Sequence, residues 1–216
     1  MKLTVHTFLT LDGVMQGPGG REEDPSGGFE FGGWLVPHYD DDMGRIVDGW
    51  FAQADAILLG RTTYEMFHPY WKQVTDPDNA VAAALNRLPK YVVSNTLTDP
   101  EWNNTTVLSG NFLEAIDDLK AEPGRELQVH GSHRLARALH DAGLVDEYRL
   151  FIFPVVLGQG KRLFETGAVP STFTLAGSKA TSTGAVYLTL LPTAFGAGDL
   201  EVGEFEVRDG QERIRD

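Results

Sequence analysis

The sequence contains no cysteine among its 216 residues, which excludes disulfide bonds and thiolate metal ligands. It also has no run of eighteen or more apolar residues, so we expect no membrane-spanning helix. Residues 1–6 lead directly into an alternating strand pattern and lack the long apolar core of a secretory signal peptide. We therefore expect a cytoplasmic protein with no membrane partner.

Basic residues are scarce, because 18 Lys and Arg face 31 Asp and Glu and give a formal net charge of −13. A chain this acidic repels a phosphate backbone, so a nucleic-acid partner is not expected. Any anionic ligand would need a local site made of backbone N–H groups, hydroxyls and individual arginines. A few basic residues beside small-residue turns therefore carry more weight than they would in a basic protein.

One such turn follows the apolar residues 56–59, which predict a short strand. Gly60 ends this strand, and Arg61, Thr62 and Thr63 follow it at the start of a helical pattern that we expect to open at Thr63. A glycine permits close backbone approach, a helix start offers free N–H groups, and arginine offers a planar fork of donors. This corner suits a phosphate group, although an ordinary strand–turn–helix junction with a solvated arginine is the alternative.

Two further strand ends have the same design of small, hydroxyl or basic residues placed directly after an apolar run. The residues concerned are Ser94, Asn95 and Thr96 after one strand, and Gly131, Ser132, His133, Arg134 and Leu135 after another. The carboxyl ends of parallel strands lie along one edge of a sheet, where ligands bind. Together the three strand ends could hold a dinucleotide by its separate phosphates.

Strand and helix patterns alternate along the chain and then give way to closing strands, which predicts an α/β fold with a mostly parallel sheet and antiparallel C-terminal additions. We expect helices over residues 39–53, from 63 onward, and over 79–88, 111–120 and 134–142. We expect strands over residues 3–11, 56–59, 91–94, 105–108, 126–130, 146–153, 172–175, 179–183 and 186–191. The pattern predicts one domain over residues 1–192 and an acidic tail over 193–216, with a further strand at 203–207.

The segment 16–33 contains seven glycines and two prolines and predicts a long flexible loop. Loops of this length inside a compact domain are uncommon and often serve as lids or binding loops. A disordered insertion is the alternative.

The order and spacing of these motifs resemble the dihydrofolate reductase-like superfamily, and most closely the reductase domain of the bifunctional riboflavin-biosynthesis deaminase–reductase. The resemblance covers about residues 1–192. It rests on the segments 10–13, 60–65, 92–94, 131–135, 143–147 and 154–160. It implies a three-layer α/β/α fold and NADPH as the hydride donor.

The resemblance also implies roles for the three strand ends. Arg61 and Thr62 would lie at the cofactor phosphates, and Ser94 to Thr96 would line the adenosine and its 2′-phosphate. Residues 131–135 would hold the pyrophosphate at a helix N-terminus. The family usually has two glycines at that last site, whereas this chain has Ser132 in the second position. We expect the hydroxyl of Ser132 to donate to phosphate, so that cofactor binding is retained in an altered form, with loss of cofactor binding as the alternative.

The same resemblance places the nicotinamide beside Asp12, Gly13 and Val14, with Asp12 at the substrate. Trp34 is a candidate stacking surface for a flat substrate, or else a core aromatic residue. Asp41 and Asp42 are candidate catalytic carboxylates on the following helix, although acidic residues at a helix start usually serve as caps and dipole partners. Water is the alternative proton source.

The leading functional hypothesis is an NADPH-dependent reductase of a small heterocycle or another C=N or C=O compound. One alternative is the 5-amino-6-(5-phosphoribosylamino)uracil reductase of riboflavin biosynthesis, whose substrate phosphate needs a second basic site from scattered residues such as Arg21, His38 or Lys161. Another is a non-catalytic NADPH-binding or interaction module. Riboflavin-family reductases imply a homodimer here. The spacing of His130, His133 and His140 does not fit a metal site.

Overall fold

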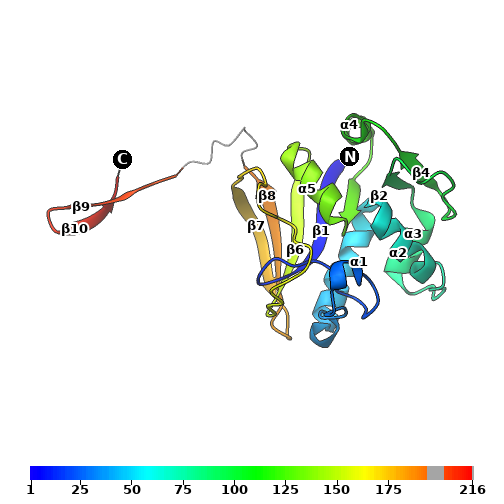
Figure 1. Cartoon of the computed structure of the whole chain (residues 1–216), viewed down its shortest axis with the longest axis horizontal. Helices are drawn as coiled ribbons and strands as arrows, with labels where there is room; N and C mark the ends of the chain where they lie inside the picture. The colour runs from blue at the N-terminus through cyan, green and yellow to red at the C-terminus, as the bar shows by residue number, and fades with distance from the viewer. Residues whose placement is uncertain (194–201, 216) are drawn as a thin grey trace.

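Eight strands form one sheet in the order β4-β3-β2-β5-β1-β6-β8-β7 in the computed structural model, which describes residues 1–193 and 202–215 (Figure 1). The strands are β1 (Lys2–Thr10), β2 (Ala54–Gly60), β3 (Lys90–Val93), β4 (Thr105–Leu108), β5 (Glu126–His130), β6 (Glu147–Phe153), β7 (Phe173–Ala180) and β8 (Val186–Pro192). The first six in this order run parallel, and β8 is antiparallel to both of its neighbours. The predicted α/β class with antiparallel closing strands is confirmed.

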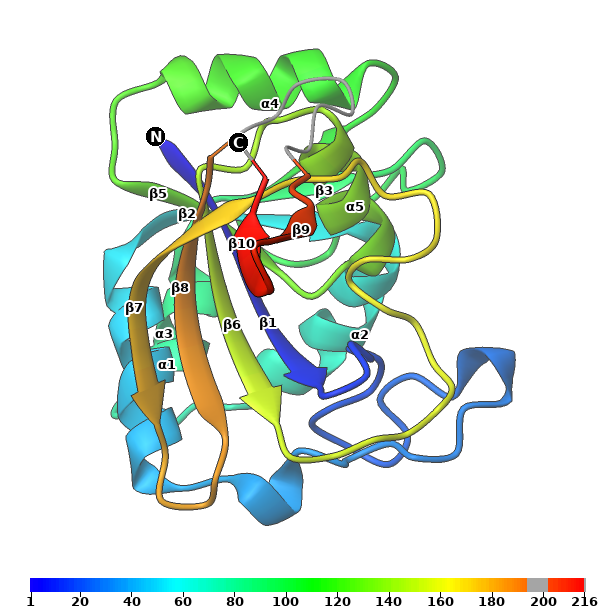
Figure 2. The same cartoon turned by 90° about the vertical axis from the view of Figure 1, so that its left-hand side faces the viewer.

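Helices cover both faces of the sheet and complete a three-layer α/β/α arrangement (Figures 1 and 2). They are α1 (Asp41–Gln53), α2 (Arg61–Trp71), α3 (Ala80–Arg87), α4 (Phe112–Ala121) and α5 (His133–Asp141). Alternate residues of β2 show how one strand serves two cores, because successive side chains point to opposite faces. Leu58 packs with α4 and α5, whereas Ile57 and Leu59 pack with α1, α2 and α3. Among the described residues, no helix is long and apolar enough to span a membrane.

The sheet face beneath α1 carries a buried polar stripe that the sequence patterns do not predict. Gln128 donates to Glu126 at 2.6 Å and to the carbonyl of Trp50 at 2.7 Å, and its own carbonyl lies 3.0 Å from His130 Nε2. His130 stacks on His6 of the neighbouring strand, with ring centroids 4.9 Å apart. Burial lowers the pKa of His130 to about 3 and, together with the charges of His130 and Arg149, lowers the pKa of His6. Both rings are therefore neutral at physiological pH.

Most expected elements differ by one or two residues from those observed, and for three of them the difference has a clear physical cause. The helix expected from Thr63 begins at Arg61, because Gly60 itself is the extended N-cap. The two short strands expected at 172–175 and 179–183 are one strand, β7, with a register shift between Leu175 and Gly177. A bulge at this irregularity interrupts the alternation without ending the pairing, so it resembles a strand end in the sequence.

The loop over residues 16–33 has an internal hydrogen-bonded frame, although we expected a flexible segment. The buried Gln16 amide donates to the carbonyls of Asp24 and Ser26, at 3.0 and 2.9 Å. Lys161 reaches in from a later loop and bonds to Asp24 and Ser26, both at 2.6 Å. One short 3₁₀ turn, Ser26–Gly28, lies within the segment, and a second, Val36–His38, precedes α1.

Beyond β8, the described residues form a two-stranded antiparallel hairpin of β9 (Phe205–Arg208) and β10 (Gln211–Ile214). The strand expected at 203–207 therefore lies slightly later and has a partner. Asp209 and Gly210 both have positive φ, as an Asp-Gly hairpin turn requires. Residues 194–201 and 216, which belong to the expected acidic tail, lie outside the described residues.

The buried histidine pair predicts a pH dependence of stability. Folded His6 and His130 stay neutral, whereas in the unfolded chain each takes up a proton with a pKa near 6.5, so the folded state loses stability as the pH falls below about 6.5. Each histidine contributes a slope of up to about 1.4 kcal/mol per pH unit. Urea unfolding between about pH 5 and 8 measures this slope. His130→Gln should reduce it, and an unchanged slope would contradict the assignment.

Candidate cofactor-binding site

The three predicted strand ends lie next to one another at the carboxyl edge of the parallel sheet. β3, β2 and β5 are consecutive in the sheet order, so the ends at Val93, Gly60 and His130 are adjacent. Gly60 pairs with Val93 in the ladder. The structure therefore brings the segments 60–63, 94–96 and 131–135 together, as the sequence predicts for parallel neighbours.

Ser132 joins two of these corners directly. Its hydroxyl accepts a hydrogen bond from the Gly60 N–H and donates one to the hydroxyl of Thr63, both at 2.8 Å. A serine hydroxyl has a single proton, and here that proton is donated in the hydrogen bond to the Thr63 hydroxyl. To donate to phosphate, as we expected, this hydroxyl would have to give up its hydrogen bond to Thr63. In this structure it joins the start of α2 to the start of α5.

The backbone of Ser132 is in the left-handed conformation, with φ 62° and ψ 62°. Gly131 before it also has a positive φ of 63°. A residue with a Cβ adopts the left-handed region at a cost of roughly 1–2 kcal/mol, whereas glycine does not. The backbone geometry therefore explains why two glycines suit this position, and the two hydrogen bonds of Ser132 offset the strain.

The helices that begin at this edge have N-termini with no side-chain cap. Gly60 has no side chain to cap α2, and Ser132 directs its hydroxyl away from its own helix, α5. In contrast, Asp40 caps α1 and Asn79 caps α3 through side-chain hydrogen bonds. The first N–H groups of a helix favour an anion, and an uncapped N-terminus leaves them available. Two such N-termini lie side by side at this edge.

Arg61 bridges two of the strand ends. Its Nε donates to Glu65 at 2.7 Å within α2, and its Nη1 donates to the hydroxyl of Thr96 beyond β3. The ion pair is solvent-exposed on both sides, so it contributes little to stability. A guanidinium held loosely at a surface can exchange Glu65 for a phosphate, which a buried and fully paired arginine cannot do cheaply.

Ser94 and Asn95 shape the loop after β3. The Ser94 hydroxyl accepts hydrogen bonds from the backbone N–H groups of Thr96 and Leu97, at 3.1 and 3.0 Å. The Asn95 side chain accepts one from Gly110 at 2.9 Å and so connects this loop to the end of β4. Both side chains hold the turn that presents Thr96 to Arg61.

The other predicted cofactor residues differ in their exposure. Thr62 and Arg134 are exposed, and His133 is half-buried with a pKa lowered chiefly by burial. Leu135 and Val14 are buried, with 6% and 0% of their surface exposed. Leu135 therefore presents only its backbone to this edge, and Val14 packs inside the apolar cluster beneath α1.

Asp12, the predicted substrate-binding carboxylate, is bound to its own loops. Its carboxylate accepts hydrogen bonds from the Thr10 hydroxyl at 2.6 Å and from the N–H groups of Leu157 and Gly158, at 3.2 and 2.8 Å. Arg162 pairs with it at 3.3 Å. Partial burial opposes ionisation, but the hydrogen bonds from Thr10, Gly158 and Leu157 lower the pKa of Asp12 to about 2. Asp12 is thus ionised at neutral pH and cannot donate a proton there.

Trp34 and the acidic run lie away from the three strand ends. Trp34 is buried, donates its indole N–H to the carbonyl of Gln16 at 2.8 Å, and meets the ring of Phe153 edge-on. Asp42 pairs with Arg45 at 2.6 Å and with Lys179 at 2.9 Å, and hydrogen bonds from these two cations lower its pKa. Asp41 is exposed at the start of α1.

Comparison with known protein families shows to which family the chain belongs. The model of the RibD C-terminal domain matches residues 1–187. The chain belongs to the RibD C-terminal domain family. The uncharacterised protein YyaP of Bacillus subtilis is 32% identical to it over 165 residues, which span 76% of this chain and 80% of YyaP.

Solved structures share the fold at lower identity. A putative riboflavin biosynthesis protein from Shewanella superposes with a TM-score of 0.68 and 21% identity, over 90% of this chain and all of that chain. A dihydrofolate reductase from Enterococcus faecalis, in a complex with NADP(H), superposes with a TM-score of 0.58 and 12% identity, over 89% of this chain and 97% of that one. The predicted resemblance to the dihydrofolate reductase-like fold and the riboflavin reductase family is confirmed.

The sequence patterns of this RibD C-terminal domain miss several residues that shape the site. Arg162 donates one hydrogen bond from Nη2 to the Asp12 carboxylate and a second from Nε to the Asp12 carbonyl, the latter at 2.8 Å. The carboxylate and the arginine are 150 residues apart, so no local spacing indicates the pair. His6 and His130 lie directly before the turn at Gly131, and only the pairing of β1 with β5 places the two rings opposite each other.

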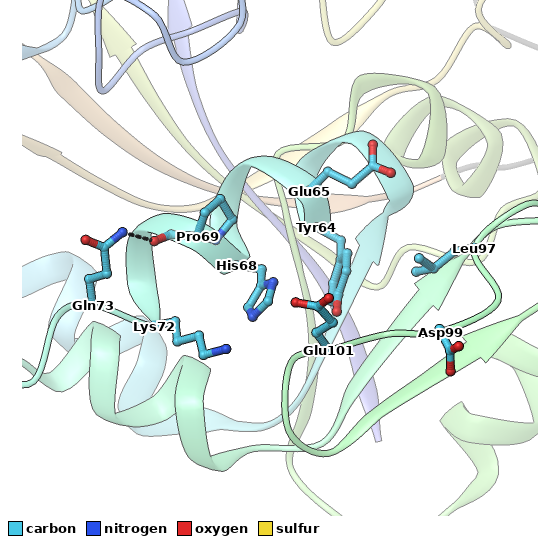
Figure 3. A pocket seen from close by; sticks show the side chains of 9 residues that line it. All are labelled: Tyr64, Glu65, His68, Pro69, Lys72, Gln73, Leu97, Asp99 and Glu101. Carbon is cyan, nitrogen blue, oxygen red and sulfur yellow. Dashed lines mark hydrogen bonds between the residues drawn. The ribbon is translucent and has the colours of Figure 1, made fainter.

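A separate shallow hollow of about 520 Å³ lies against the outer side of α2 (Figure 3). Side chains of α2 and of residues 97–101 line it, among them Tyr64, His68 and Glu101. Among the described residues, none of the predicted cofactor-binding residues lines this hollow. The strand-end site is therefore defined by its donors at the sheet edge, and the hollow adjoins it, because Glu65 pairs with Arg61 and Leu97 bonds to Ser94. The described residues also contain no group of three potential metal ligands.

Two substitutions of Ser132 distinguish the stability that its hydrogen bonds contribute from the cost of its backbone strain. Ser132→Ala loses both bonds and keeps a Cβ in the left-handed conformation, so it should reduce the free energy of unfolding by about 1–3 kcal/mol. Ser132→Gly loses the same bonds but removes the strain, so it should be less destabilised than the alanine variant by about 1 kcal/mol. Chemical denaturation of both proteins measures the difference, and equal stabilities would contradict the strain at this position.

Proposed function

We propose that this chain is an NADPH-dependent reductase that transfers a hydride to a small heterocyclic substrate or another C=N or C=O compound. The observation that carries the proposal is the meeting of two uncapped helix N-termini and a bridging arginine at three adjacent strand ends. A cofactor with separate phosphates suits such a site, because each helix N-terminus favours one anion. Membership of the RibD C-terminal domain family supports the same reading.

The residues present fit NADPH. The N-termini of α2 and α5 would receive the pyrophosphate, with Gly60 and Gly131 allowing backbone approach and Thr62 adding an exposed hydroxyl. Arg61 and Thr96 would receive the 2′-phosphate side of the adenosine, where an exposed guanidinium replaces its bond to Glu65 by a phosphate contact. The donors are local, as a chain of net charge −13 requires.

At the other end of the proposed site, Asp12 holds the loops around the end of β1. Its carboxylate joins β1 to the segment 157–162 and so fixes the backbone beside which the reacting ring would lie. Bound NADPH would supply the hydride. Asp12 and Asp42 have lowered pKa values and are ionised at neutral pH, so neither suits the role of proton donor. We therefore assign proton delivery to water.

Two of the cations near the loop 16–33 are already paired with carboxylates, which weighs against a phosphoribosyl substrate. Lys161 pairs with Asp24 at 2.6 Å and Arg162 pairs with Asp12, whereas Arg21 of the loop is exposed and stays a candidate for a substrate phosphate. Among the described residues, these two cations are therefore committed to carboxylates of the protein. The 5-amino-6-(5-phosphoribosylamino)uracil reductase remains the alternative, and a module that binds NADPH without turnover is the other.

Fluorescence titration of the purified chain tests the proposal. NADPH should bind with a dissociation constant in the micromolar range, because its charged groups meet several donors without a dedicated buried cation. Absence of binding at tens of micromolar would overturn the reductase assignment. Binding without NADPH oxidation, across a panel of C=N and C=O compounds, would instead support the non-catalytic module.

Arg61→Ala tests whether this guanidinium senses the extra phosphate of NADPH. The variant should bind NADPH at least about tenfold more weakly, a loss of roughly 1.4 kcal/mol, and should bind NADH with little change. Arg125→Ala is the matched control, because Arg125 is also exposed and paired with a carboxylate, Asp55, but lies at the opposite edge of the sheet. Equal weakening of NADPH and NADH by Arg61→Ala would assign it a structural role only.

A further inference from the structure

Arg61 occupies an unfavourable position in α2. It is the first residue of the helix, it follows the N-cap Gly60, and the first turn contains no acidic residue. The N-terminus of a helix carries a partial positive charge, which disfavours a cation and favours an anion. A residue that conflicts with local helix preferences often marks a functional site. We therefore expect Arg61 to serve an anion that does not belong to the helix start.

Glu65 is the anion that Arg61 has in this structure. Its Oε1 lies 2.7 Å from Arg61 Nε, and the side chains of Arg61 and Glu65 are 46% and 47% exposed, respectively. An acidic residue that follows a basic one at this helical spacing is the weaker order of such a pair, and an exposed ion pair contributes little to stability. The stability of α2 is therefore a poor explanation for the pair.

The pair occupies part of the guanidinium that a phosphate would use. An arginine binds a phosphate most strongly when it offers two parallel N–H donors. Nε of Arg61 is engaged by Glu65, and Nη1 is engaged by the hydroxyl of Thr96. A phosphate at this corner therefore competes with the carboxylate of Glu65, which also repels it because the two charges have the same sign.

Glu65 has room to leave Arg61. It lies at the rim of the hollow beside α2, near Leu97. Figure 3 shows its carboxylate directed away from the ring of His68 and from Glu101. Within residues 1–193 and 202–215, the bond to Arg61 is the one hydrogen bond of this carboxylate. Its displacement therefore leaves no group other than Arg61 without a partner.

NADPH and NADH differ only in the 2′-phosphate, so this pair decides between them. When NADH binds, Arg61 keeps Glu65 and neither charge loses its partner. When NADPH binds, the phosphate gains Arg61, but the bond to Glu65 is lost and the carboxylate remains nearby. The preference for NADPH is thus a difference between two contacts of one exposed guanidinium, and it is smaller than the full strength of an arginine–phosphate contact.

We propose that Glu65 is a specificity-determining residue of this cofactor site. It competes with the 2′-phosphate for Arg61 and thereby leaves the site open to NADH as a second cofactor. This role rests on the proposed NADPH-dependent function and names NADH as a further hydride donor. The dissociation constant of NADH should exceed that of NADPH by only about tenfold.

A charge series at position 65 tests the proposal by fluorescence titration with NADPH and with NADH at low ionic strength. Glu65→Gln should raise the ratio of the NADH to the NADPH dissociation constant about fivefold, because the competing charge is removed. Glu65→Lys should raise this ratio further, because it adds a cation near the phosphate. Both increases should come from tighter NADPH binding, with NADH nearly unchanged. A role limited to the stability of α2 would shift both dissociation constants together.

Glu101→Gln is the matched control. Glu101 is exposed and lines the same hollow, and it forms no ion pair within the described part of the chain. The variant therefore removes the same charge on the same side of α2 without removing a partner of Arg61. Its ratio of dissociation constants should stay close to that of the wild-type chain.

The outcomes separate the role of Glu65 from the proposed function. Failure of the wild-type chain to bind NADPH would overturn both. If NADPH binds, three results would overturn the role of Glu65 alone. These are a ratio that the two Glu65 variants leave unchanged, an equal rise in Glu101→Gln, and NADH binding to the wild type more than about a hundredfold weaker than NADPH.

Discussion

The hydroxyl of Ser132 is the contact on which the geometry of the candidate site depends. It joins the backbone of Gly60 to the side chain of Thr63, across 72 and 69 residues of sequence. Two helix starts are thereby held at a fixed separation, and neither helix is capped by a side chain. A serine in the left-handed region is strained, so the arrangement persists only because these two hydrogen bonds offset the strain.

The polar stripe beneath α1 adds a second constraint on the same strands. Arg149 donates to Glu126 and Glu147, at 2.6 and 2.5 Å, and the pairs are largely buried. Gln128 continues this network toward His130, directly before Gly131. Breaking one member would leave a buried polar group without a partner, which is costly. The network therefore fixes the register of β5, and with it the position of the strand end at Gly131.

Local patterns in the sequence predict much of the fold and the three strand ends, because an apolar run that stops at Gly60 or Gly131 is a short-range signal. The parallel order of the sheet then brings these ends together. The use of the Ser132 hydroxyl could not be predicted in the same way, since it depends on the approach of two distant corners. The hydrogen-bonded frame of the loop 16–33 was missed for the same reason, because Lys161 supplies part of it from a distant segment.

The two ends of the proposed site differ in how their charged groups are used, and this difference bears on the reaction. At the phosphate end, Arg61 is exposed and paired only at the surface, so it can exchange a carboxylate for an anion. At the reactive end, Asp12 is held by four donors, and Arg162 and Lys161 are paired with carboxylates. These three charged side chains stabilise the loops around the end of β1 through their own pairs. A reductase built this way would rely on binding and orientation of the hydride donor more than on a fixed acid.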